Sequence, residues 1–159
     1  MTRIGRVVIA STRAAAGVYV DRCGPLVVDW LNERGIVTPN PIVVADGAPV
    51  LSALRAAVAE SVDILVTSGG TGISPTDTTP QATVAVIDYE IPGLADAIRD
   101  AGLPAVPTSI LSRGVCGVAG RTLIVNLPGS PGGVRDGLGV LGTVIDHALN
   151  QLAGEDHPQ

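Results

Sequence analysis

The sequence predicts one α/β domain of three layers, α/β/α, with helices on both faces of a mostly parallel sheet. Apolar runs of strand length alternate with segments of helical periodicity along the 159 residues, an order typical of parallel sheets. Glycine-rich turns also follow two of the runs, and ligands bind at that edge in open α/β sheets. We place the domain at residues 1–152 and expect a loose tail at 153–159.

Local patterns predict the elements of the first half. A continuous apolar run predicts a buried strand over 6–10. A helix opens at Gly24-Pro25 and ends at Gly35. Two prolines interrupt a second strand over 36–44, which we expect to be short or near an edge. A helix then begins at Pro49, and a third strand covers 62–67.

The second half continues the alternation. Helices are expected from Pro80 and over 93–101. Residues 110–118 fit a short helix, a short strand or both. A late central strand covers 123–127, and one last helix runs over 131–152.

Composition excludes several classes of function. The net charge is −5 with no basic stripe, which argues against nucleic-acid binding. No apolar run approaches the roughly 20 residues of a membrane span, and no signal-type segment opens the chain, so we expect a cytoplasmic protein without a membrane partner. Lysine is absent, so any protein cation on a phosphate must be arginine. Cys23 and Cys116 are expected to be small buried residues.

Two glycine turns are the clearest functional signal. The first, Ser68-Gly69-Gly70-Thr71-Gly72, leads to Thr79-Pro80, and the second, Pro128-Gly129, leads to Ser130-Pro131. A hydroxyl before proline predicts a helix N-cap in both cases. Glycines let the backbone approach a ligand, and free N–H groups at a helix start favour an anion. The turns therefore predict one ligand with phosphate groups, or two ligands.

Two acids stand near these turns. Asp77 is either a magnesium ligand beside bound phosphates or a loop and capping residue, and we favour the ligand. Asp46 alone would more often be a turn residue or a cap. If both lie at one sheet edge, two acids near an anion require a cation between them, and that indicates Mg²⁺.

Polar residues elsewhere could reach the same edge. Ser11 and Thr12 follow the first strand, and Ser112-Arg113 form another candidate pair. Arg13 and Arg113 could each hold a phosphate through two N–H groups. Each could equally be a surface arginine, which is our expectation for Arg13.

The ordered set of motifs resembles the molybdenum-cofactor biosynthesis family that includes MogA, MoaB and the gephyrin G domain. The resemblance implies a molybdopterin-binding fold, typically trimeric. Its active members transfer AMP from ATP to the terminal phosphate of molybdopterin, which suggests later handover to a molybdate-insertion protein. The matching segments span nearly the whole chain: Asp21-Arg22-Cys23-Gly24-Pro25, Ser68 to Gly72, Asp77-Thr78-Thr79-Pro80-Gln81-Ala82-Thr83, Glu90-Ile91-Pro92-Gly93, Ile110-Leu111-Ser112-Arg113-Gly114 and Asn126 to Pro131.

The resemblance also implies roles for single residues. Asp46 and Asp77 would support Mg²⁺ and catalysis. Residues that would bind nucleotide or substrate are Ser11, Ser68, Gly69, Gly70, Thr71, Gly72, Ser112, Arg113, Pro128, Gly129 and Ser130.

The chain departs from the family pattern at two positions. Thr76 stands where an arginine often precedes the acid, and Ser11-Thr12 stands where Ser-Asp is common. A non-catalytic molybdopterin-binding or carrier protein of the same fold, like MoaB, is therefore the alternative interpretation. A second alternative is another phosphate-binding α/β domain, such as a relative of nucleotide amidases.

Overall fold

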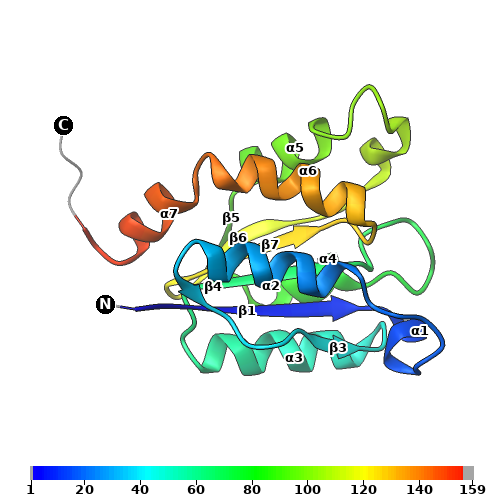
Figure 1. Cartoon of the computed structure of the whole chain (residues 1–159), viewed down its shortest axis with the longest axis horizontal. Helices are drawn as coiled ribbons and strands as arrows, with labels where there is room; N and C mark the ends of the chain where they lie inside the picture. The colour runs from blue at the N-terminus through cyan, green and yellow to red at the C-terminus, as the bar shows by residue number, and fades with distance from the viewer. Residues whose placement is uncertain (1, 156–159) are drawn as a thin grey trace.

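The central sheet of the computed structural model, which describes residues 2–155, runs in the order β2-β1-β4-β7-β6-β5 (Figure 1). A short strand, β3, also pairs with β1. Pairs among the strands from β1 to β4 and β7 are parallel, whereas β6 pairs antiparallel with both β7 and β5. The strands are β1 Arg3–Ala10, β2 Ile36–Val37, β3 Ile42–Val44, β4 Ile64–Ser68, β5 Tyr89–Glu90, β6 Cys116–Ala119 and β7 Thr122–Leu127. The mostly parallel sheet is as predicted.

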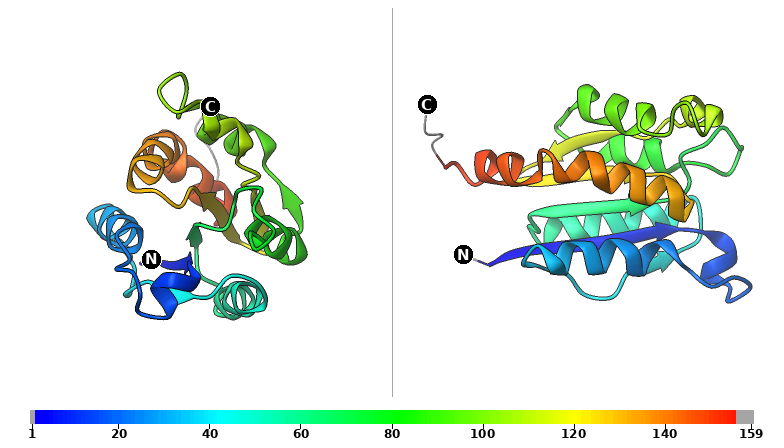
Figure 2. Two further views of the ribbon diagram at one scale, coloured as in Figure 1. Left: turned by 90° about the vertical axis from the view of Figure 1, so that its right-hand side faces the viewer. Right: turned by 45° about the horizontal axis from the view of Figure 1, so that its top comes forward.

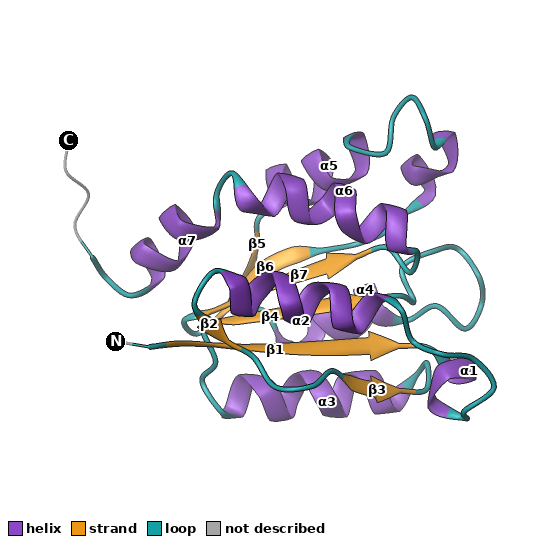
Figure 3. Ribbon diagram, viewed as in Figure 1, coloured by secondary structure: helices purple, strands orange, loops and turns teal. Residues whose placement is uncertain are grey.

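Helices cover both faces of this sheet, which gives the three predicted layers (Figures 2 and 3). α2, α5, α6 and α7 pack on one face, and α3 and α4 pack on the other. The helices are α1 Thr12–Ala15, α2 Cys23–Glu33, α3 Ala48–Ala59, α4 Thr79–Val86, α5 Pro92–Asp100, the 3₁₀ helix η1 Pro107–Leu111, α6 Pro131–Gly142 and α7 Ile145–Leu152. None of these described helices is long and apolar enough to cross a membrane.

The alternation of side chains along β1 explains why its run is continuously apolar. Val7 and Ile9 face the layer of α2 and α6, and Val8 and Ala10 face the layer of α3 and α4. Because successive side chains of a strand point to opposite faces, a strand buried on both sides has no polar position. The sheet is therefore buried on both faces, and its carboxyl edge carries the loops.

The second predicted strand is split by its prolines, as its sequence indicated. β2 and β3 both pair with β1, and residues 38–41 run between them without strand pairing. Proline has no N–H to donate to a ladder, so the segment cannot pair throughout its length.

The single last helix predicted over 131–152 is wrong. α6 ends at Gly142, and α7 begins at Ile145. The N–H groups of Thr143 and Val144 turn back to carbonyls three residues earlier, which closes α6 with a tight turn. Glycines in α6 weaken helix propagation, and the break lets Ile145 and Leu149 pack into the core.

Other boundaries also differ from the expectations. The ambiguous segment 110–118 resolves into the end of η1 and the strand β6, and the two-residue strand β5 was not predicted. Residues 153–155 of the expected tail include a turn in which the Glu155 N–H donates to the Asn150 carbonyl. The rest of that tail, residues 156–159, lies outside the described residues.

Candidate functional site

The two glycine turns lie side by side at the carboxyl edge of the sheet. β4 and β7 are neighbouring parallel strands, with Ser68 in register with Leu127. The Ser68 hydroxyl donates to the Pro128 carbonyl at 2.7 Å, and the Gly69 N–H donates to the Leu127 carbonyl at 3.2 Å. These bonds join the two predicted ligand turns into one surface.

The first turn requires glycine at two consecutive positions. Gly69 and Gly70 have φ values of +91° and +67°, which other residues rarely adopt. A β-carbon on Gly69 would lie 2.4 Å from the Ala10 carbonyl oxygen, and one on Gly70 would lie 2.3 Å from the Thr79 Oγ1. The bare backbone therefore passes between the end of β1 and the start of α4. Among the described residues, no acceptor takes the Gly70 N–H, which leaves this donor for a ligand.

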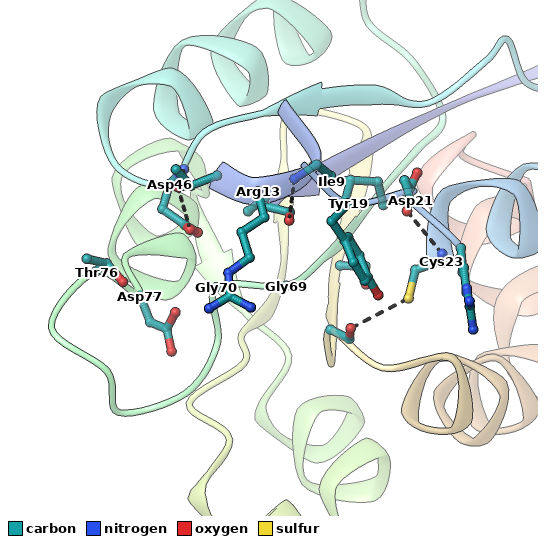
Figure 4. Close-up of a pocket in the computed structure, with 17 residues that line it drawn as sticks. Ile9, Arg13, Tyr19, Asp21, Cys23, Asp46, Gly69, Gly70, Thr76 and Asp77 are labelled. Carbon is teal, nitrogen blue, oxygen red and sulfur yellow. Dashed lines mark hydrogen bonds between the residues drawn. The ribbon is translucent and has the colours of Figure 1, made fainter. Parts of the chain in front are cut away.

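A cavity of about 480 Å³ opens beside this turn (Figure 4). Its wall contains the predicted residues Ser11, Asp46, Ser68, Gly69, Gly70, Asp77 and Gly129. The other predicted residues lie outside its wall: Thr71, Gly72, Ser112, Arg113, Pro128 and Ser130. The structure thus brings both acids and both turns to one cavity.

Asp46 is held in place by the first helix after β1. Its Oδ2 accepts a hydrogen bond from the Thr12 hydroxyl at 3.0 Å, and its N–H donates to the same Thr12 oxygen at 3.1 Å. The other oxygen, Oδ1, faces Gly70, because a β-carbon there would lie 3.2 Å from it. One carboxylate oxygen therefore remains directed at the turn.

Asp77 is placed by Arg113 acting on the backbone. The Arg113 Nε donates to the Gly72 carbonyl at 2.9 Å, and its Nη2 donates to the Asp77 carbonyl at 2.8 Å. The Arg113 N–H also donates to the Thr71 carbonyl at 2.7 Å. Arg113 thus clasps the loop that carries Asp77. Its predicted contact with a ligand stays a prediction.

The predicted hydroxyl caps have different outcomes. Ser130 is the N-cap of α6, since its Oγ accepts from the Gly133 N–H at 3.2 Å. The Thr79 cap is wrong: α4 begins at Thr79 itself, and its buried Oγ1 has no partner among the described residues. The Thr79 N–H is taken by the Gly70 carbonyl at 3.1 Å, so the backbone of the turn, not a side chain, fixes this helix start. Ser112 has a local role, because its Oγ accepts from the Gly114 N–H.

One wall of the cavity was not assigned to the site from the sequence, although Asp21 to Cys23 belong to a segment that matches the family. It contains Tyr19, Asp21, Arg22 and Cys23, which lie on the segment between β1 and α2. The Asp21 Oδ1 accepts from the N–H groups of Cys23 and Gly24, both at 3.0 Å, and so caps α2. An aspartate two residues before the helix start was the available signal.

Cys23 is buried, as predicted, but it also touches the second turn. Its Sγ lies 3.7 Å from the Gly129 carbonyl oxygen. Burial raises the pKa of this thiol above its usual 9.0. The thiol therefore stays protonated at neutral pH and can act as a weak donor to that carbonyl.

The donor set fits Mg²⁺ shared with a bound phosphate. Asp46 and Asp77 line the same cavity as the free Gly70 N–H. Mg²⁺ is usually held by one or two carboxylates together with substrate phosphates and water. Among residues 2–155, no group of three or more His, Cys, Asp and Glu side chains forms a closed metal cage. The arrangement thus suits a metal that arrives with its substrate.

The chain is similar in sequence to proteins of one known family. Residues 6–147 match the family described as "Probable molybdopterin binding domain". The chain is 40% identical over 143 residues to a molybdopterin adenylyltransferase of Haemophilus influenzae, covering 87% of this chain and 72% of that protein. It is 34% identical to a molybdenum cofactor biosynthesis bifunctional protein of Synechococcus elongatus over 95% of its own length, but spans 48% of that protein.

Solved structures show the same fold. A MogA structure superposes with a TM-score of 0.93 at 69% identity, covering 94% of this chain and 99% of that one. The Mog protein of Mycobacterium ulcerans gives a TM-score of 0.91 at 66% identity over the same shares. From these matches and the paired glycine turns, the chain is a member of the molybdopterin-binding-domain family that contains MogA and MoaB.

Proposed function

We propose that this protein is a molybdopterin adenylyltransferase of molybdenum cofactor biosynthesis. It would transfer AMP from ATP, with Mg²⁺, to the terminal phosphate of molybdopterin. The names of its relatives support this activity. The observation that carries the proposal is the meeting of Asp46, Asp77 and both glycine turns at one cavity.

The reaction needs two anionic ligands held close together. An oxygen of the molybdopterin phosphate attacks the α-phosphorus of ATP, the bond from that phosphorus to the bridging oxygen breaks, and pyrophosphate leaves. Because the attacking phosphate is already ionised, no general base is required. Catalysis then rests on positioning and on neutralising charge.

The residues of this chain supply that positioning. The free Gly70 N–H donates to a phosphate oxygen of the nucleotide, and Gly129 places the second ligand beside the first. Asp46 and Asp77 would hold the metal, Asp46 through the oxygen that Thr12 leaves free. Mg²⁺, when bound there, neutralises the phosphate oxygens and the departing pyrophosphate.

The alternative is a molybdopterin-binding or carrier protein without catalysis. The observation in its favour is that Thr12 and Thr76, both neutral, line the cavity at the two positions where the family pattern differs. Against it, both candidate metal ligands are kept in the wall of that cavity. Family membership removes the remaining alternative, an unrelated phosphate-binding domain.

An assay with purified protein distinguishes the adenylyltransferase from the non-catalytic carrier. Incubation with molybdopterin and Mg-ATP should give adenylylated molybdopterin and an equal amount of pyrophosphate. A carrier would bind molybdopterin and form neither product.

We also propose that the protein is a homotrimer in the cytoplasm that hands its product to a molybdate-insertion protein. Exposed apolar side chains support an assembly: Val18, Ile73, Val84, Tyr89, Ile110 and Leu111 are each at least 47% exposed in the described chain. Sedimentation at micromolar concentration should give a single species of three times the chain mass, and a monomer would contradict the trimer.

A further inference from the structure

Arginine is the only basic side chain of this protein besides histidine, and half of its arginines are engaged with other groups of the described chain. The sequence has 10 lysine and arginine residues, all of them arginine. Within residues 2–155, partners are seen for Arg3 with Asn150, Arg6 with Glu60, Arg34 with Trp30, Arg99 with Asp96 and Arg113 with two carbonyls. A phosphate in the cavity must therefore find its cation among the remaining arginines or in a metal.

Two of the remaining arginines line the cavity, Arg13 and Arg22. The two arginines differ in their neighbouring residues. Arg22 adjoins Asp21 at the start of α2, whereas Arg13 follows Thr12, the residue that holds Asp46. In Figure 4 the Arg13 side chain extends from the end of β1 toward the Gly69–Gly70 turn, on the side where Asp46 and Asp77 lie. Arg13 is thus the arginine at the end of the cavity where Asp46 and Asp77 lie, which we call the carboxylate end.

The backbone that carries Arg13 is fixed at three points. The Ser11 N–H donates to the Val44 carbonyl at 2.9 Å, and the Ser11 Oγ accepts from the Ala14 N–H at 3.2 Å. The Thr12 hydroxyl bonds to Asp46 at 3.0 Å. The helix start is therefore tied to β3 and to the acidic loop, while the guanidinium has no partner in the described chain.

Because the cavity wall carries negative charges, a positively charged side chain there would help it to bind an anion. Asp21, Asp46 and Asp77 line it and repel an anionic ligand. Arg113, the arginine first favoured from the sequence, uses its donors on the carbonyls of the loop. A guanidinium offers paired donors that match phosphate oxygens.

We propose that Arg13 binds phosphate oxygens at the carboxylate end of this cavity and is the protein's own cation for that anion. This deepens the proposed function, because the phosphate belongs either to the nucleotide or to molybdopterin. The binding itself depends only on phosphate chemistry, so it can be tested without turnover.

The test measures the affinity of Arg13→Gln by calorimetry with Mg-ATP, magnesium tripolyphosphate, molybdopterin and adenosine. Charged hydrogen bonds of this kind predict a loss of about 10- to 100-fold for the phosphate ligand that Arg13 contacts, with no change for adenosine. A loss for ATP and tripolyphosphate assigns Arg13 to the nucleotide, and a loss for molybdopterin alone assigns it to the acceptor. Arg13→Lys, which keeps the charge, should recover part of the affinity.

The matched control is Arg121→Gln, which removes an exposed arginine from the turn before β7, at the opposite edge of the sheet. It should leave every affinity unchanged. Arg113→Gln should instead lower the melting temperature, because it releases two carbonyls of the Asp77 loop.

The outcomes separate this proposal from the proposed function. Tripolyphosphate binding that depends on Arg13, without AMP transfer, supports the Arg13 site and contradicts the activity. AMP transfer in Arg13→Gln with wild-type affinity for all three phosphate ligands overturns the Arg13 site and leaves the activity standing. A wild-type protein that binds none of these ligands overturns both.

Discussion

Gly129 lies against Gly69: a β-carbon on Gly129 would be 3.2 Å from the Gly69 Cα. Gly69 cannot retreat, because its N–H is bonded to the Leu127 carbonyl and its own Cα faces the Ala10 carbonyl. The two ligand turns therefore touch through bare backbone, and their spacing depends on the absence of a side chain at Gly129.

We predict that Gly129→Ala weakens binding of both ATP and molybdopterin. The added methyl group pushes the turns apart, at a cost of about 1–3 kcal/mol in the free energy of unfolding. Gly132→Ala is the matched control, since no heavy atom lies within 4 Å of a β-carbon there. Because Gly132 is inside α6, its replacement should raise stability by about 0.5–1 kcal/mol. Wild-type affinity and stability in Gly129→Ala would show that the turns do not need this contact.

Asp77→Asn should abolish AMP transfer and leave molybdopterin binding largely intact. The amide is nearly isosteric, and Arg113 holds the loop through backbone carbonyls that the substitution keeps. What is lost is the negative charge for Mg²⁺. Turnover and molybdopterin affinity are measured together, with Asp136→Asn on the exposed side of α6 as control. Normal turnover in Asp77→Asn would assign Asp77 to the loop structure alone.

Asp46→Asn should have a similar but milder effect on turnover. The Thr12 hydroxyl can still bond to the amide oxygen of the variant, so the loop should keep its shape. A loss of turnover as large as that of Asp77→Asn would place Asp46 directly on the metal. No loss at all would remove it from the site.

How far the sequence predicts this protein depends on how local each signal is. The buried strands were found because apolar runs such as Val7 to Ile9 reflect burial on both faces of the sheet. The Ser130 cap was found because hydroxyl and proline lie next to each other in the chain. Gly69 and Gly70 were found because a positive φ limits those positions to glycine.

The misses all depend on contacts between distant segments. Thr79 does not act as a cap, because the Gly70 carbonyl takes its N–H. β5 exists only through its pairing with β6. Arg13 is exposed, as expected, but it also lines the cavity beside Thr12, whose hydroxyl bonds to Asp46, 34 positions away. No periodicity in the sequence carries these relationships.

Ser130→Ala should lower stability and weaken molybdopterin binding. Loss of the bond to the Gly133 N–H costs about 0.5–2 kcal/mol, out of roughly 5–15 kcal/mol for a typical domain, so the variant should fold. Calorimetric titration of the folded variant gives the affinity separately from the melting temperature. Unchanged affinity with a lower melting temperature would contradict this prediction and make Ser130 a helix cap only.

Alkaline pH should destabilise the fold through Cys116. Burial raises the pKa of this thiol from 9.0 to about 12. Above pH 9 the unfolded chain loses the proton while the folded chain keeps it, so the free energy of unfolding falls by up to about 1.4 kcal/mol per pH unit. Urea unfolding at about pH 8 and about pH 10.5 measures this fall. Cys116→Ala should show a smaller fall, and an equal one would exclude this thiol as its source.

The transfer of labelled phosphate tests the central claim most directly. Purified protein is incubated with molybdopterin, Mg²⁺ and ATP labelled at either the α- or the γ-phosphate. If the protein transfers AMP, the α label moves to molybdopterin and the γ label appears in pyrophosphate, and both transfers are lost in Asp77→Asn. Molybdopterin that binds but never acquires the α label would contradict the adenylyltransferase and leave a binding protein of the same fold.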